Sequence, residues 1–240
     1  MLLAMKNRSR PWKHWSSQPT PPAVDGRIIR VPTLKVGGRK IARHNRGSNT
    51  GYILDPIEFV LRECESDKEY LAVLLAFSEK EVASVVCQAP IFRYFDQDGA
   101  ERSTYFDLVI TFTDGRKIVV MVKTAERVWK KDISRQAAQM STQLNGFADS
   151  IRLVTEADMP FWLVHNARLF HSVRQDSDTH LDQLVLARAQ GLNRDVSIED
   201  LVAPFQGGFR STARLLFDGK LASVVPEAIF PETMVKATSV

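Results

Sequence analysis

Cysteine is scarce in this chain and long apolar runs are missing. The 240 residues include two cysteines, Cys64 and Cys87, without Cys-x-x-Cys spacing, so neither a disulfide scaffold nor a cysteine zinc site is expected. No segment approaches the roughly 20 consecutive apolar residues that a membrane helix needs. The first five residues are too short for a signal-peptide core. We expect a cytoplasmic protein with free buried thiols and no membrane contact.

Several common catalytic motifs are also missing. The sequence contains no HExxH, GxxxxGK[ST] or GxSxG motif, which argues against zinc proteases, P-loop nucleotidases and α/β-hydrolases. His165 and His171 are about 600° apart on a helix, so they are expected to be structural or surface residues. The composition, 44% hydrophobic and 25% charged, is that of a globular protein with one or two domains.

Positive charge is concentrated at the start of the chain. The formal net charge is +4, yet residues 1–50 contain eleven Lys or Arg residues and a single acid, Asp25. Prolines are frequent there, so residues 1–45 are expected to form an arm without its own core. Such an arm suits the phosphate backbone of DNA, and a solubilising tail is the alternative. The residues expected to contact DNA are Arg39, Lys40, Arg43 and Arg46.

Local patterns predict an α/β domain over residues 46–175. Asp55-Pro56 has the form of a helix start, with proline at the first helical position. Ser66-Asp67-Lys68-Glu69 predicts a capping box that begins a second helix. Strands are expected at 82–86, 91–95 and 151–155, and helices at 127–144 and 163–173. The expected architecture is a mixed sheet flanked by helices.

The remainder, residues 176–240, has a different pattern. Helical spacing recurs over 181–189 and 211–217, and Ser197 begins a further short helix. We expect a small helical or winged-helix-like module that ends in an extended tail.

A hairpin carries the most informative residues of the chain. Two strand-like segments, 106–113 and 117–123, flank Asp114-Gly115, a strong turn signal. Asp107 begins the first strand and Lys123 ends the second, although both residue types are disfavoured in strands.

The turn type decides whether these two charged residues meet. A two-residue turn pairs Thr113 with Arg116 and directs Asp107 and Lys123 to opposite sides of the sheet. A three-residue loop with left-handed Gly115 pairs Phe112 with Arg116 instead. Asp107 then faces Met121, with Lys123 as a diagonal neighbour on the same face. The chemistry favours this second register, in which all three residues point towards the start of the Ser66 helix.

An aspartate on one strand and a lysine on the next is the layout of the PD-(D/E)xK nucleases. The aspartate carboxylate suits Mg²⁺, a hard cation that prefers oxygen ligands. In nucleases of this class, the lysine ammonium lies beside the attacking water and stabilises negative charge on the phosphate. The metal ion polarises the phosphoryl group. An exposed strand-end ion pair is the alternative explanation.

The ordered set of segments resembles the TnsA family, the endonuclease subunit of heteromeric transposases. The resemblance covers roughly residues 40–175 and continues more weakly beyond. It is carried, in order, by Ser66–Leu71, Val82–Val86, Gln88-Ala89-Pro90, Phe106-Asp107-Leu108, Val120–Lys123, Leu153–Glu156 and Asn166.

This resemblance implies a restriction-endonuclease-like domain and Mg²⁺-dependent nicking at the 5′ ends of a transposon. Mn²⁺ is expected to substitute for Mg²⁺. The implied partners are transposon-end double-stranded DNA, a TnsB-like DDE transposase and a TnsC-like AAA+ ATPase. By position, Glu69, Asp107 and Lys123 become the catalytic residues. Glu69 also has a competing interpretation as the reciprocal residue of the capping box.

One position departs from the family pattern. The family has Gln or Glu two residues before the lysine, where this chain has Met121, and a thioether is a poor ligand for Mg²⁺. The expected metal ligands are therefore Glu69, Asp107 and the Val122 carbonyl, with waters. The alternatives are an assembly subunit with impaired catalysis and a stand-alone nuclease of the same superfamily. If position 121 is the ligand position, Met121→Gln or Met121→Glu is expected to strengthen metal binding and nicking. If the register were wrong, Glu101 or Asp114 would be the next residues to test.

Overall fold

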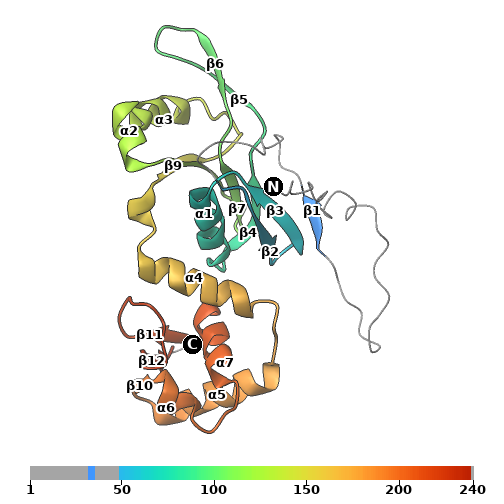
Figure 1. Ribbon diagram of the computed structural model, residues 1–240, viewed down its shortest axis with the longest axis vertical. Coiled ribbons are helices and arrows are strands. Elements are labelled where there is room, and N and C mark those ends of the chain that lie inside the picture. Colours follow the sequence, from blue (N-terminus) through green and yellow to red (C-terminus); the bar gives the residue numbers. More distant parts are fainter. Residues whose placement is uncertain (1–31, 36–48, 239–240) are drawn as a thin grey trace, which may run out of the picture.

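The computed structural model describes residues 32–35 and 49–238 (Figure 1). Its centre is a four-stranded mixed sheet in the order β4-β7-β8-β9, in which only β8 and β9 are parallel. The strands are β4 (Val82–Cys87), β7 (Leu108–Phe112), β8 (Lys117–Val122) and β9 (Ser150–Val154). The expected α/β class with a mixed sheet is therefore present, and so are strands close to the three predicted ranges outside the hairpin.

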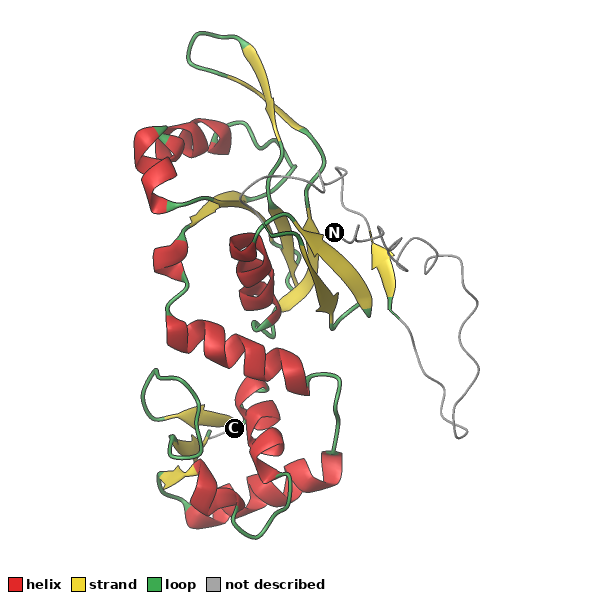
Figure 2. Cartoon of the chain, viewed as in Figure 1, coloured by secondary structure: helices red, strands yellow, loops and turns green. Residues whose placement is uncertain are grey.

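The alternation of side chains along β8 divides the interior between two cores. Val120 and Val122 pack with α1 (Asp67–Phe77) and α4 (Phe161–Val173). Val119 and Met121 pack with α3 (Ile133–Ser141). Successive residues of a strand point to opposite faces, so helices cover the sheet on both sides. Figure 2 shows this arrangement, with the helices in red around the yellow strands.

The expected helix after Asp55-Pro56 is wrong. The chain forms β2 (Gly51–Asp55), a tight turn and β3 (Val60–Cys64), which pair antiparallel, and β1 (Thr33–Lys35) adds to β3 in parallel. Asp55 accepts from Arg62 over 2.7 and 3.0 Å, and both side chains are buried. This ion pair joins the two strands across the turn. The local helix-start pattern at Asp55-Pro56 carries no information about this contact with Arg62.

The predicted helix over 127–144 is broken in two. α2 (Ala125–Lys130) ends before Asp132, whose φ of 46° lies in the left-handed region, and α3 follows. The β5–β6 hairpin, formed by Phe92–Phe95 and Glu101–Thr104, projects from the sheet beside these helices (Figure 1). Gln139 of α3 and Gln143, just after it, bond to the Phe95 backbone. Sequence analysis found β5 but not β6.

The C-terminal part combines three helices with a small antiparallel sheet in the order β10-β12-β11. The predicted helices at 181–189, from Ser197 and at 211–217 are present, and Ser197 caps its helix as expected. The strands were not predicted. The elements are, in chain order, α5 (Thr179–Leu192), β10 (Val196–Ser197), α6 (Ile198–Val202), α7 (Gly208–Phe217), β11 (Leu221–Ser223) and β12 (Met234–Ala237).

Helix α7 is the central helix of this C-terminal part. It packs against α4, α5, α6 and β11. Its two arginines form ion pairs with aspartates at the beginning of the C-terminal part. Arg210 binds Asp176, which precedes α5, at 2.8 Å, and Arg214 binds Asp182 of α5 at 2.7 Å. α7 therefore presents no free cationic face. Among the residues that the structure describes, no helix is long and apolar enough to cross a membrane.

Candidate functional site

The β7–β8 hairpin has the three-residue loop that the sequence favoured. Gly115 has φ 88°, and the Phe112 N–H donates to the Arg116 carbonyl over 2.8 Å. The ladder then runs to the pair Leu108–Val120. The register in which Asp107 lies opposite Val122 is excluded, because Leu108 already pairs with Val120.

Asp107 bends out of this ladder and meets Lys123. Its backbone N–H donates to the Val120 carbonyl over 3.0 Å. Its carboxylate Oδ2 accepts from the Val122 backbone N–H and from Lys123 Nζ, each over 2.7 Å. Lys123 Nζ also donates to the Val122 carbonyl over 3.1 Å. Thus the Asp107 side chain takes the place of a backbone acceptor for Val122, and it fixes the lysine at the end of β8.

Met121 does not join this group, contrary to the expectation that it points towards α1. Its side chain is 5% exposed and packs in the core on the α3 side, with Phe106, Ile133 and Met140. Met121 keeps the side-chain direction that the β8 ladder gives it, whereas Asp107 bends out of the ladder. The two side chains therefore do not share a face, although their residues lie opposite each other in the register. The thioether therefore does not stand where a third metal ligand would be needed.

Glu69 approaches the pair from the first turn of α1. Ser66 caps the helix as predicted, with the Glu69 N–H donating to Ser66 Oγ over 3.2 Å, but the reciprocal bond of a capping box differs, because the Glu69 carboxylate accepts from the backbone N–H of Glu65 instead of Ser66. Glu69 Oε2 accepts from the Glu65 backbone N–H and from Gln88 Nε2, both over 3.0 Å. Burial and then the negative charge of Asp107 raise the pKa of Glu69, while Lys123 lowers it. The carboxylate thus serves the helix start and lies within the electrostatic reach of Asp107 and Lys123.

Gln88 is the site residue that sequence reasoning missed. It is 1% exposed and has φ 54°. Its backbone N–H donates to the Asp107 carbonyl over 2.8 Å, and its side-chain amide donates to Glu69. Gln88 therefore connects β7 to α1. The available signal was an amide residue directly after the apolar strand β4.

The oxygen atoms at this strand end suit a hard cation. Glu69, Asp107 and the Val122 carbonyl supply them, and Asp107 Oδ1 takes no part in the bonds to Val122 and Lys123. Within the described ranges, no cluster of three or more His, Cys, Asp or Glu residues is arranged to hold a metal. Mg²⁺ commonly retains several waters, so two carboxylates and a carbonyl are compatible with it.

The remaining sequence candidates lie elsewhere. Asp114 binds Arg116 in the exposed turn at the far end of the hairpin, and Glu101 pairs with Arg93 on the β5–β6 hairpin. Cys64 and Cys87 are free and buried as expected. A hydrogen bond with Cys87, together with burial, raises the pKa of the Cys64 thiol. The proposed DNA contacts Arg39, Lys40, Arg43 and Arg46 lie outside the described residues.

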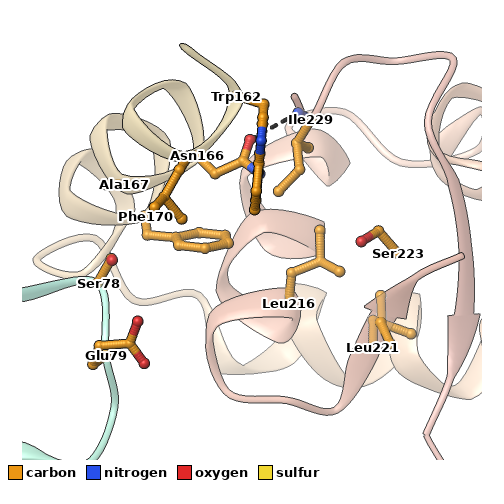
Figure 3. Close-up of a pocket in the computed structure, with 12 residues that line it drawn as sticks. Ser78, Glu79, Trp162, Asn166, Ala167, Phe170, Leu216, Leu221, Ser223 and Ile229 are labelled. Carbon is orange, nitrogen blue, oxygen red and sulfur yellow. Dashed lines mark hydrogen bonds between the residues drawn. The ribbon is translucent and has the colours of Figure 1, made fainter. Parts of the chain in front are cut away.

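A hollow next to the C-terminal part is separate from this strand end. A cavity of about 330 Å³ lies between α4 and α7 and is lined by Trp162, Phe170 and Leu216 (Figure 3). Asn166 in its wall accepts from the Ile229 N–H over 2.8 Å and donates to the Glu227 carbonyl over 2.8 Å. Asn166 thereby holds the segment before β12, which is a structural role.

Comparison with known proteins leaves the function to be argued from this geometry. A scan against protein-family models finds no match to the chain, and a search of the curated proteins finds no significant match. The candidate site is thus defined by what the structure brings together: two carboxylates, one ammonium and one buried amide at the end of β8.

Proposed function

We propose that this protein is a TnsA-like DNA endonuclease subunit of a heteromeric transposase. It would hydrolyse a phosphodiester at the 5′ ends of a transposon, with Mg²⁺ as cofactor and Mn²⁺ as a substitute. The observation that carries the proposal is the contact between Lys123 and Asp107 at 2.7 Å, with Glu69 within electrostatic reach. The wider support is the sheet with helices on both faces, which agrees with a restriction-endonuclease-like domain.

The chemistry of the site follows from the residues that surround it. Glu69 and Asp107 would hold the cation, which supplies charge to polarise the phosphoryl group and lower the pKa of a bound water. The Val122 N–H and the Gln88 amide keep the two carboxylates in place. Lys123 has three donors, two of them used on Asp107 and Val122. The third donor is available to a phosphate oxygen, where it would stabilise the charge of in-line attack by water. The products would be a 5′-phosphate and a 3′-hydroxyl.

The C-terminal part is proposed to contact protein partners more than DNA. Its helix–strand–helix–helix–strand–strand order agrees with a winged-helix-like module. Because α7 has its arginines bound to Asp176 and Asp182, it is poorly suited to enter a DNA groove. We therefore propose that residues 176–240 bind the TnsB-like transposase or the TnsC-like ATPase.

A nicking assay on transposon-end DNA with both partner proteins, Mg²⁺ and Mn²⁺ tests the activity. Asp107→Ala is expected to abolish nicking and metal binding. Lys123→Ala is expected to lower the rate about 10²-fold, the effect of losing one transition-state donor, and to change metal affinity much less. Asp114→Ala, which removes an exposed turn acid, is the matched control. Equal nicking by wild type and Asp107→Ala would refute the proposed site.

The burial of Met121 favours a second candidate, a subunit that assembles the complex without cutting. With Met121 in the α3-side core, the described residues form no group of three or more side chains that could hold a metal at this strand end. If the protein binds DNA and its partner proteins but does not nick DNA, the assembly-subunit function is supported. A gene neighbourhood without a transposase and an ATPase would instead favour a stand-alone nuclease.

A further inference from the structure

Helix α2 carries the most exposed large apolar side chain of the described residues. Trp129 is 83% exposed, and no residue of α2 is buried. The helix is nevertheless anchored at both ends. Thr124 caps its start, Glu156 accepts from the Ala125 N–H, and α3 begins with the buried Ile133. An indole held in water on a fixed helix is unusual for a side chain of this size, because its burial is favourable.

Cationic residues flank Trp129 along the chain. They are Arg127, Lys130, Lys131 and Arg135, all exposed. Two of them have acidic neighbours, since Lys130 binds Glu126 at 2.6 Å and Asp132 lies 4.0 Å from Arg135. Arg127 and Lys131 form no ion pair within the part of the chain that the structure describes. The surface formed by these four residues and Trp129, here named the α2 corner, is therefore positively charged.

The α2 corner follows the candidate site directly in the chain. Lys123 directly follows β8, Thr124 caps the helix, and Trp129 is the fifth residue of α2. At 1.5 Å per residue, the backbone of Trp129 lies about 8 Å along the helix axis from the Thr124 cap. That is two to three base steps of about 3.4 Å. A DNA strand with a phosphate beside Lys123 would reach the α2 corner within a few nucleotides.

We propose that the α2 corner binds the DNA strand next to the scissile phosphate, with Trp129 stacked on an unpaired base and the four cations on the neighbouring phosphates. This inference rests on the proposed nuclease function for its location. Its binding chemistry is independent of catalysis. Exposed aromatic rings among Lys and Arg stack on the bases of unpaired strands, because every base has a π-face. Bases inside a duplex are already stacked and offer the indole only their edges. The surplus of positive charge favours a polyanion over an apolar protein surface.

Binding of the full-length chain to three fluorescent DNA probes, in buffer with EDTA, tests this inference. The probes share one sequence and are a blunt duplex, the same duplex with a three-nucleotide single-stranded tail, and the single strand. Trp129→Ala is expected to weaken binding about fivefold or more on the tailed and single-stranded probes. Its effect on the blunt duplex is expected to stay below about twofold, and Trp129→Phe should remain close to wild type because it keeps a ring.

Two further variants separate the contribution of base stacking to DNA affinity from two other effects. These effects are the loss of positive charge and the loss of any exposed aromatic ring. The double substitution Arg127→Gln, Lys131→Gln should weaken binding to all three probes and reduce the magnitude of the negative slope of log K against log[salt] by about 1.4 to 1.8. Phe161→Ala, which removes a 73% exposed ring on α4, should bind like wild type. Circular dichroism melting should give one midpoint for all variants, since the changed side chains are exposed.

The outcomes discriminate between this inference and the proposed function. Unchanged affinity of Trp129→Ala for all probes, or equal loss on the blunt duplex, would overturn the stacking contact. Because EDTA prevents cleavage, a Trp129-dependent preference for unpaired DNA would stand even if nicking were never detected. Conversely, normal nicking by wild type with no role for Trp129 in binding would refute only the α2 corner.

Discussion

The Gln88 side-chain amide donates a hydrogen bond to Glu69 Oε2 over 3.0 Å, while its backbone N–H bonds to Asp107. One buried residue, directly after β4, thus holds the Glu69 carboxylate and the backbone of Asp107. The Gln88 side chain is buried. If its hydrogen bond to Glu69 were removed, water could not replace the bond without a rearrangement of the surrounding residues.

The first prediction concerns this amide. Gln88→Ala is expected to destabilise the protein by about 1–3 kcal/mol, because it leaves a buried carboxylate with one donor fewer. It should also lower nicking while leaving DNA affinity intact. Urea unfolding and the nicking assay measure the two effects. Gln175→Ala, which removes an exposed amide bonded to the Pro56 carbonyl, should change stability by less than about 0.5 kcal/mol. Equal effects of the two substitutions would contradict the role of Gln88.

The second prediction reverses the expectation from sequence for position 121. Met121→Glu should place an unpaired carboxylate in the core around Phe106 and Ile133 and cost about 3–5 kcal/mol. It should not raise nicking. Met121→Leu, close to it in volume, should cost less than about 1.5 kcal/mol. Urea unfolding measures both variants. A stable Met121→Glu protein with stronger Mg²⁺ binding would show that the side chain reaches the metal after all.

The third prediction concerns the pH dependence of stability. Burial, and then the charge of Arg174, lowers the pKa of His171, whose ring stacks on Phe77 at 6.2 Å. The folded state therefore disfavours the protonated ring. The stability present above the ordinary pKa of 6.5 should be lost as the pH falls through the lowered pKa. His171→Phe should remove this step from a series of urea midpoints below pH 6.5. His180→Gln, at an exposed position of α5, should keep it.

The fourth prediction tests the basic arm. Replacement of Arg39, Lys40, Arg43 and Arg46 by Gln should weaken binding to duplex DNA of any sequence. Each lost phosphate contact should reduce the magnitude of the negative slope of log K against log[salt] by about 0.9. Fluorescence anisotropy over a salt series measures this. Deletion of residues 1–31, which keeps the β1 strand that pairs with β3, separates the rest of the arm from these four residues. An unchanged slope in both variants would indicate a solubilising or protein-docking arm.

Features encoded by neighbouring residues were predicted well. The Ser66 N-cap, the Asp114-Gly115 hairpin and the helices of the C-terminal part all depend on bonds that span a few residues. The pairing of Asp107 with Lys123 was also accessible, because the left-handed glycine fixes the register of the hairpin. Because these interactions close short loops, the entropic cost of forming them is small, and local sequence patterns predict them directly.

The tertiary structure decided the features that depend on distant residues. The helix signal at Asp55-Pro56 yielded to a strand pair held by the buried Asp55–Arg62 bridge. Met121 keeps the α3-side direction of β8 whereas Asp107 bends out of the ladder, and Gln88, directly after β4, reaches the Glu69 carboxylate and the Asp107 backbone carbonyl. The sequence by itself determined which residues form the helices and the hairpin. Packing across the sheet alone determined which side chains share a site, because side-chain direction at a strand end depends on the partner strand rather than on the residue type.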